Sequence, residues 1–310
     1  MKKIVLFFIV LLLPLSLNVQ ASDSSTLGRS FLVSTDWLSE HLNDKNLVLL
    51  EVRYHPHRYL TVGHIPGAIQ VERFADLGDN FANPLMRLPS RKQFQNTLRR
   101  WGVKKNSTIV IYDDSATALA SRVFFLLDLY GFNMKQVKIL DGGVREWSAF
   151  EDLETKPNHP KRSHIKIGKR DHSKYVEWTA IYRHVVSERR PNITLLDARP
   201  FDMYTGKLIK HAIRGGHIPG AINIVSLNGI EGQNWISVED LQKMYQPIPK
   251  DHTVYVYCHD GFRMSLAYVQ LKSLGYKDVR LYNGGWSHWG NALTLPVVEG
   301  DKPYSGDFEL

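Results

Sequence analysis

The residues best suited to do chemistry lie in one short stretch, which contains the only cysteine among 310 residues. The members of this stretch are Cys258, His259, Asp260, Gly261, Phe262 and Arg263. It follows an apolar run, Val254–Tyr257, and precedes apolar residues that are spaced by three and four up to Leu274. We therefore expect a loop that joins the end of a strand to the start of a helix.

A loop in this position predicts a nucleophilic thiol. Backbone N–H groups and the positive end of the helix dipole both favour an anion at the centre of such a loop. The pattern therefore predicts a lowered pKa for Cys258, with help from the charge of Arg263 and from His259. Gly261 allows the backbone to turn tightly. A cysteine of this kind is suited to attack an anionic substrate.

Two other interpretations of the stretch predict different behaviour. A lone cysteine is most often a buried structural residue, but the polar neighbours of Cys258 favour catalysis. A cysteine phosphatase uses a Cys-x5-Arg loop, and that spacing would place an arginine where Met264 stands. The arginine comes one residue earlier, at Arg263. The spacing therefore disfavours a cysteine phosphatase.

Short apolar runs alternate with helical patterns on both sides of this loop. The spacing from Met264 to Leu274 predicts an amphipathic helix, and Gly275 stands in the usual position past a helix end. The alternation predicts an α/β fold, in which each domain has a mainly parallel sheet flanked by helices. The runs typical of buried strands are Leu47–Leu50, Ile109–Tyr112, Ile193–Leu196, Val254–Tyr257 and Val279–Tyr282.

An internal duplication organises the chain. Residues 63–69 and 216–222 have the same sequence, Gly-His-Ile-Pro-Gly-Ala-Ile, 153 residues apart. Leu49–Arg53 matches Leu195–Arg199, and the turn Asp-Gly-Gly at 141–143 matches Asn-Gly-Gly at 283–285. The chain therefore consists of two copies of one domain. We predict these copies over residues 30–150 and 174–295, joined by a linker over 151–173 that wraps the surface.

The first 21 residues have the pattern of a secretory signal peptide. Lys2 and Lys3 precede an apolar run from Ile4 to Leu17, and Ala21 completes a small-x-small end. The run is shorter than the ~18–20 residues that cross a bilayer. We therefore expect cleavage after Ala21 and export, to the periplasm in a Gram-negative source. We expect no stable membrane insertion after cleavage.

Composition excludes several classes of protein and site. One cysteine permits no internal disulfide and no site with two thiolate ligands. The net charge of +8 is spread along the chain without long runs, so we expect no nucleic-acid partner. His55 and His57 lack a third ligand at useful spacing, and no dinucleotide or phosphate-binding glycine pattern is present. We therefore expect no metal and no cofactor.

These features together resemble the tandem rhodanese-type sulfurtransferases. The resemblance rests on the two copies, both Gly-His-Ile-Pro-Gly-Ala segments, the two glycine turns and the cysteine loop, and it covers about residues 30–295. In such proteins only the C-terminal copy usually keeps the cysteine. Asp113 stands at that position in the first copy. The resemblance therefore implies that the first domain is inactive and forms one wall of the active cleft.

The resemblance also implies a two-step sulfur transfer. Cys258 attacks the outer sulfur of a small anionic donor such as thiosulfate, sulfite leaves, and a persulfide remains until cyanide or a thiol acceptor takes the sulfur. The backbone N–H groups of residues 259–263 would hold the persulfide. Arg263 would bind the sulfonate of the donor with its planar fork.

Other residues gain expected roles from the two copies. The family places the arginine of the Asp-x-Arg element beside the catalytic loop, so Arg199 is a second candidate for anion binding and Asp197 is expected to orient it. His64 and His217 occur in both copies, including the copy without a cysteine. We therefore expect these histidines to stabilise a turn. Trp147 and Trp289 are likewise expected to pack in the core.

Two alternatives to a thiosulfate sulfurtransferase stay open at this point. 3-Mercaptopyruvate is a rival donor, but its users resemble a Cys-Gly-Ser-Gly type of loop, from which His259, Asp260 and Arg263 depart. Thiosulfate users more often have basic loops, and Asp260 would repel a dianionic donor. The protein could also be a persulfide carrier or a protein-binding module without turnover. In every case we expect Cys258 at the bottom of a cleft between the copies, with several N–H groups pointing at its sulfur.

Overall fold

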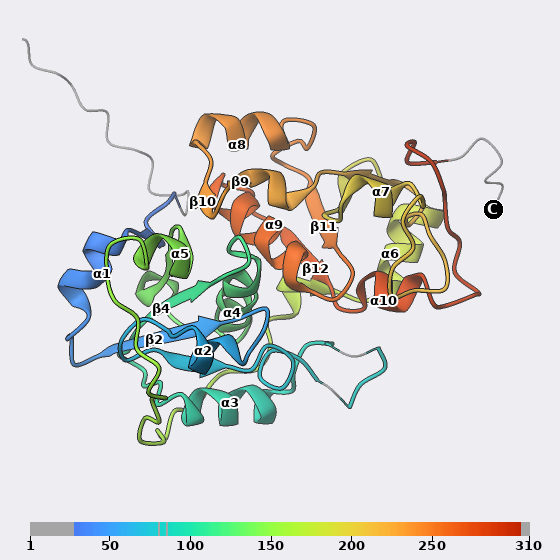
Figure 1. Cartoon of the computed structure of the whole chain (residues 1–310). Helices are drawn as coiled ribbons and strands as arrows, with labels where there is room; N and C mark the ends of the chain where they lie inside the picture. The colour runs from blue at the N-terminus through green and yellow to red at the C-terminus, as the bar shows by residue number, and fades with distance from the viewer. Residues whose placement is uncertain (1–27, 80, 85, 305–310) are drawn as a thin grey trace, which may run out of the picture.

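The computed structural model describes residues 28–79, 81–84 and 86–304. The predicted signal peptide lies outside these residues. Two domains with one topology lie side by side, the first in blue to green and the second in yellow to red in Figure 1. Within the described part of the chain, no helix is both long and apolar enough to span a bilayer.

The first domain is built on a five-stranded parallel sheet with the order β1-β5-β4-β2-β3. Helix α1 begins after Ser34, whose side chain accepts the N–H of Trp37, and α3 begins with a capping box between Ser90 and Gln93. The helices and strands of this domain are β1 (Leu32–Val33), α1 (Thr35–His41), β2 (Leu47–Val52), α2 (Arg58–Thr61), β3 (Ile69–Val71), α3 (Arg91–Arg100), β4 (Thr108–Asp113), α4 (Ala118–Leu129), β5 (Val137–Leu140) and α5 (Gly143–Trp147).

The second domain repeats this sheet with the order β6-β12-β11-β7-β8, again parallel throughout. It adds an antiparallel hairpin, β9–β10. Its helices and strands are β6 (Tyr175–Val176), α6 (Trp178–Ile181), β7 (Ile193–Asp197), α7 (Phe201–Tyr204), β8 (Ala221–Asn223), β9 (Ile230–Glu231), β10 (Asn234–Trp235), α8 (Val238–Tyr245), β11 (Thr253–Tyr257), α9 (Phe262–Ser273), β12 (Val279–Tyr282) and α10 (Gly285–Trp289).

The predicted α/β fold with two mainly parallel sheets is confirmed. Each apolar run expected to be a strand lies within one of β2, β4, β7, β11 or β12. These strands are covered on both faces, which is why they read as continuous apolar runs rather than as alternating patterns. The predicted helix after the cysteine is α9, and Gly275 follows it with a positive φ of 86°.

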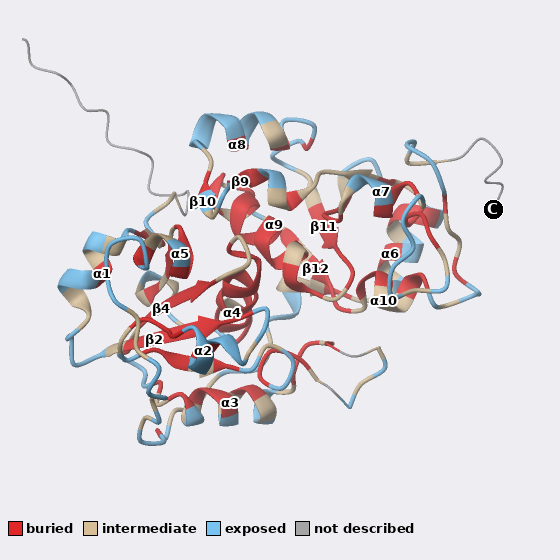
Figure 2. Cartoon of the chain, in the orientation of Figure 1, coloured by how far each residue is buried: buried red, intermediate tan, exposed pale blue. Residues whose placement is uncertain are grey.

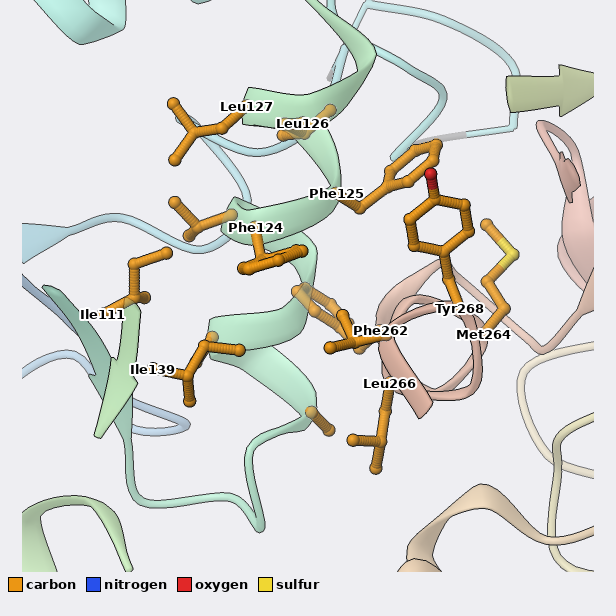
Figure 3. Packing of buried hydrophobic residues seen from close by; sticks show 14 of the residues in the cluster. Ile111, Phe124, Phe125, Leu126, Leu127, Ile139, Phe262, Met264, Leu266 and Tyr268 are labelled. Carbon is orange, nitrogen blue, oxygen red and sulfur yellow. The ribbon is translucent and has the colours of Figure 1, made fainter. Parts of the chain in front are cut away.

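Helix α9 differs from the expected amphipathic helix because it is buried on nearly all sides. Ten of its twelve residues are buried. One side covers its own sheet, and the other packs against α4 of the first domain, so the two helices form the centre of the molecule (Figures 1 and 2). The side chain of Phe125 on α4 meets Tyr268 on α9 edge to face, with ring centroids 5.0 Å apart (Figure 3).

The two glycine turns tie the domains together reciprocally. The carboxylate of Asp141 in the first domain accepts the backbone N–H of Trp235 in the second, at 3.0 Å. In return, the side-chain oxygen of Asn283 accepts the backbone N–H of Leu88, at 2.8 Å. Each of the duplicated turns therefore holds one domain to the other.

The segment between the domains runs in extended form along the first domain. The N–H of Ser163 donates to the carbonyl of Arg99, whose side chain donates to the carbonyl of Ile165. Further along, the N–H of Asp171 donates to the carbonyl of Leu129 at the end of α4. The chain past residue 295 also packs on its domain, where the N–H of Gly220 donates to the carbonyl of Pro303.

The duplicated histidines hold turns in the same way in both domains. His64 stacks on Tyr59 and bonds through its ring nitrogens to the carbonyls of Tyr59 and Lys156. His217 stacks on Tyr204 and bonds to the carbonyls of Tyr204 and Lys302. Both rings are fully buried. This geometry agrees with a structural role for both histidines.

The helix interface gives a stability prediction. Phe125 is fully buried, so Phe125→Ala should lower the free energy of unfolding by about 3–5 kcal/mol, through lost apolar burial and a cavity between α4 and α9. Urea unfolding measures this change. Phe150→Ala, at a position where 77% of the residue is exposed, is the matched control and should change it by less than about 0.5 kcal/mol. Equal effects of the two substitutions would contradict the interface described here.

Candidate active site

The cysteine lies where strand β11 gives way to helix α9. The strand ends at Tyr257, which pairs with Asp197 of β7, so Cys258 is the first residue beyond the sheet. Its sulfur accepts the N–H of Gly261 at 3.1 Å, and the N–H of Met264 also faces it. Of the predicted N–H groups of residues 259–263, that of Gly261, the residue before α9, contacts the sulfur. The N–H of Met264 lies outside the predicted range.

The predicted lowering of the cysteine pKa is wrong. Burial raises the pKa of the Cys258 thiol, and the nearby carboxylate of Asp260 raises it further. The N–H of Met264, the charge of Arg263 and the N–H of Gly261 act in the opposite direction but do not outweigh burial. The sequence argument considered the dipole and the charges, but it had no measure of desolvation.

The structure buries the sulfur that we predicted to lie at the bottom of a cleft between the domains. Cys258 has no exposed surface and belongs to the apolar core that the two domains share. The ring of Phe262 meets Phe74 of the first domain edge to face, with centroids 6.4 Å apart. Among the loop residues, Asp260 and Arg263 are only half-buried. These two side chains are therefore where a solute would first meet the loop.

Two glycines let other segments approach the loop closely. Gly261 has a φ of 115°, and a Cβ at this position would lie 3.1 Å from Nη1 of Arg122 in the first domain. Gly285 has a φ of 57°, and a Cβ there would lie 2.5 Å from the carbonyl oxygen of His259. Any side chain at either position would push its neighbour away. The carbonyl of Cys258 in turn accepts the N–H of Trp286, at 2.8 Å.

The remaining residues of the loop have distinct environments. His259 is buried with no hydrogen-bond partner at Nδ1, and burial lowers its pKa, so the ring is neutral at pH 7. Its ring lies 5.8 Å from that of His211, between centroids. The guanidinium of Arg263 forms no ion pair with a described residue and approaches the sulfur of Met203, at 4.0 Å. Arg263 is therefore available to an anionic ligand.

Arg199 is held in a buried ion pair with Asp197, close enough to the loop for its charge to act on His259. Its guanidinium donates to the carboxylate of Asp197, with the shortest contact at 2.6 Å, and to the carbonyl of Gly216, at 2.7 Å. The first domain repeats this pattern, where Arg53 pairs with Glu51 and donates to the carbonyl of Gly63. Because the domain without a cysteine has the same ion pair, we favour a structural role for Arg199. Arg263 is then the cation available to a ligand.

The first domain has a carboxylate where the second has the thiol. Tyr112 and Tyr257 occupy matching positions, since their hydroxyls accept the N–H groups of Ile65 and Ile218. The next residue is Asp113, whose two carboxylate oxygens accept four N–H groups at 2.8–3.0 Å. These N–H groups belong to Ser115, Thr117, Leu119 and Ala120. Burial raises the pKa of Asp113, and the N–H groups of Ala120, Ser115 and Thr117 oppose that shift. The loop of the first domain is therefore a cradle of N–H groups that its own side chain fills.

Arg122 is a residue of the site that the sequence analysis missed. It lies on α4 of the first domain, is fully buried, and donates to the carbonyls of Leu77 and Met86, while Nη1 has no partner. Burial lowers the pKa of Arg122 to about 10, and attraction to Cys258 and Asp260 partly opposes this, so the guanidinium stays charged at neutral pH. A single arginine in an apolar helix, at Ala118–Leu129, was the signal that could have found it.

The described residues contain no group of three or more histidine, cysteine, aspartate or glutamate side chains that could hold a metal ion. The side chains at this site offer a thiol, a neutral imidazole, a carboxylate and two guanidinium groups. A covalent intermediate on sulfur is the reaction that these groups fit.

Comparison with known proteins gives consistent matches over most of the chain. The rhodanese-like domain family matches twice, over residues 34–150 and 185–292. The chain is 32% identical to the sulfur carrier protein TtuD of Thermus thermophilus, over 87% of this chain and 97% of that protein. It is 30% identical to the thiosulfate sulfurtransferase of Corynebacterium glutamicum, over 87% and 91% of the two chains. The structure of SseA, a 3-mercaptopyruvate sulfurtransferase from Escherichia coli, superposes with a TM-score of 0.73 at 25% identity. The match covers 83% of this chain and 98% of SseA.

The charges around the thiol predict that two substitutions shift the pKa of Cys258 in opposite directions. Because burial raises the pKa of Cys258, its thiolate should form on the alkaline side of its ordinary range. Asp260→Asn should lower the pH midpoint by about one pH unit, since it removes a like charge, and Arg122→Met should raise it by a similar amount. The ultraviolet absorbance of the thiolate, as a difference from Cys258→Ser, measures the midpoint. A shift in the same direction for both variants would refute this electrostatic account.

Proposed function

The chain belongs to the rhodanese family of sulfurtransferases, and from that premise we propose that it transfers sulfur from thiosulfate to a nucleophilic acceptor through a persulfide on Cys258. The relatives named for thiosulfate transfer support this choice of donor. The observation that carries the persulfide is the pair of matching loops, one of which already surrounds an acidic side chain, Asp113, with N–H groups.

The hydrogen bonds of Asp113 in the first domain support this proposal for the second loop. The N–H groups of Thr117 and Ala120 contact opposite oxygens of Asp113, and their counterparts at the start of α9 are those of Gly261 and Met264. A carboxylate extends farther from the backbone than a thiol does. A second sulfur on Cys258 would extend the side chain in the same way and place the negative charge among these N–H groups.

The reaction proceeds in two displacements. The thiolate of Cys258 attacks the outer sulfur of thiosulfate, a sulfur–sulfur bond forms, and the bond to the central sulfur breaks so that sulfite leaves with the electron pair. Cyanide or a thiolate then attacks the outer sulfur of the persulfide, and Cys258 leaves as the thiolate. Sulfur is transferred without any outside oxidant.

Protons and charges at the site set the conditions for the first step. Because its pKa is raised, the thiol must lose a proton as it reacts. The loop offers two acceptors, the unpaired Nδ1 of His259 and the half-buried carboxylate of Asp260. Arg263 is half-buried and available to the sulfonate oxygens of the donor, which offsets repulsion from Asp260. Because the sulfur is covered, the donor must displace side chains at the domain interface to reach it.

The alternatives differ in what happens to the persulfide. 3-Mercaptopyruvate, the substrate named for the relative from Escherichia coli, would form the same intermediate on Cys258. A sulfur carrier, like the relative from Thermus thermophilus, would form the persulfide and pass it to a partner with little turnover on small molecules. We further propose that the protein is exported, on the basis of residues 1–21.

One assay with two readouts tests this proposal. The wild type with thiosulfate and cyanide should release thiocyanate, and thiosulfate alone should add one sulfur atom to the intact mass. Cys258→Ser should lose both signals, because it removes the nucleophile. A persulfide without turnover would favour the carrier. No added sulfur from thiosulfate or from 3-mercaptopyruvate would contradict the persulfide mechanism.

A further inference from the structure

We propose that the first domain carries a second binding site, which takes a bulky organic anion. The site is a cavity of about 1190 Å³ between the end of α3, the turn before β4 and the linker. Ligand sites commonly measure ~300–1,000 Å³, so this cavity has room for far more than an inorganic ion. None of the residues 258–263 lines it, so it is separate from the cysteine loop.

The charge of the cavity has one sign. Its thirty lining residues include six cationic side chains and no aspartate or glutamate. None of the six forms an ion pair with a carboxylate of the described residues. The six are Lys45, Lys104, Lys105, Lys161, Arg162 and Lys166. Cations gathered around a concave wall without acids concentrate anions there.

The wall beneath these charges is apolar and contains an unused donor. The half-buried Phe132, Ile165 and Ile167 present its accessible apolar surface, above the buried side chains of Phe94 and Leu98. Trp101 also lines the cavity, is only 1% exposed, and its indole N–H has no hydrogen-bond partner. A buried N–H without a partner costs about 1–3 kcal/mol. A ligand oxygen would remove that cost only if the covered indole turned toward it.

The linker makes the cavity a formed site rather than an open surface. Its hydrogen bonds to Arg99 fix residues 163–165 along α3. At the other end, Gly102 has a φ of 69°, and a Cβ there would lie 3.1 Å from Pro160 of the linker. The linker therefore presses against the end of α3, next to Trp101. Because this wall is already held, binding need not order it.

These features specify the chemistry of the ligand. The apolar wall fits an aliphatic or aromatic body, and the cations fit one or more phosphate, sulfonate or carboxylate groups. A neutral apolar molecule would leave the cations without a partner, and an inorganic anion would leave the apolar wall without a contact. We therefore expect an anion with an apolar body to bind more tightly than either the inorganic anion or the neutral body.

Three probes test this expectation on the full chain. 1-Naphthyl phosphate combines an apolar ring system with an anionic group. 1-Naphthol has the ring system without the phosphate, and inorganic phosphate has the anion without the ring system. The readout is the ¹⁵N–¹H spectrum of the seven tryptophan indoles, in which Trp101→Phe identifies the signal of Trp101. 1-Naphthyl phosphate should shift that signal and bind at least about tenfold more tightly than the other two probes. Equal affinity for 1-naphthol, or an unmoved Trp101 signal, would overturn the proposal.

Charge variants complete the test. Lys104→Glu combined with Lys105→Glu should weaken binding of 1-naphthyl phosphate about tenfold, since each reversal replaces an attraction with a repulsion. The matched control combines Lys92→Glu with Lys302→Glu, two exposed lysines that do not line the cavity, and should change affinity less than about twofold. Wild-type affinity should also fall as salt is added. Equal losses in both double variants, or no salt dependence, would contradict a site built on these cations.

Discussion

The structure depends on one balance, between the cost of burying a charged sulfur and the N–H groups that meet it. Cys258 is fully covered, and this burial raises the pKa of its thiol. The start of α9 opposes that cost with the N–H groups of Gly261 and Met264, and the neighbouring domain adds the buried guanidinium of Arg122. The Cys258 thiol is therefore less readily ionised than an ordinary cysteine. In the mechanism that we propose, the outer sulfur of the persulfide would have these N–H groups as partners until an acceptor arrives.

The duplication explains how the second domain obtains this environment. The first domain fills its own loop with Asp113, so it cannot take a sulfur, but it supplies α4, which packs against α9. From that helix Arg122 reaches Gly261, a residue whose missing side chain leaves room for it. The first domain thus contributes packing and a charged side chain to the loop of the second. The exchange of hydrogen bonds at Asp141 and Asn283 keeps the two loops in a fixed relation.

Much of this could be predicted from local patterns. The strands, the duplicated domains and the loop around Cys258 follow from apolar runs, from an exact repeat and from one cysteine placed between a strand and a helix. Properties that depend on packing could not be predicted in this way. Burial by residues far away in the chain raises the pKa of Cys258. Helix α9 is buried on nearly all sides because α4 of the first domain packs against it, and the sequence of α9 alone does not reveal that contact. A structural role for the ion pair of Arg199 with Asp197 could be inferred only by comparison with the matching pair in the first domain, Arg53 with Glu51.

The central claim is that backbone N–H groups at the start of α9 hold the persulfide as those of the first domain hold Asp113. A crystal structure of the protein after reaction with thiosulfate tests it most directly. The outer sulfur should lie within about 3.5 Å of at least two backbone nitrogens among Gly261, Phe262, Arg263 and Met264, in the range of hydrogen bonds to a soft acceptor. An outer sulfur that points into solvent or against the apolar wall, with no backbone N–H in reach, would contradict the account.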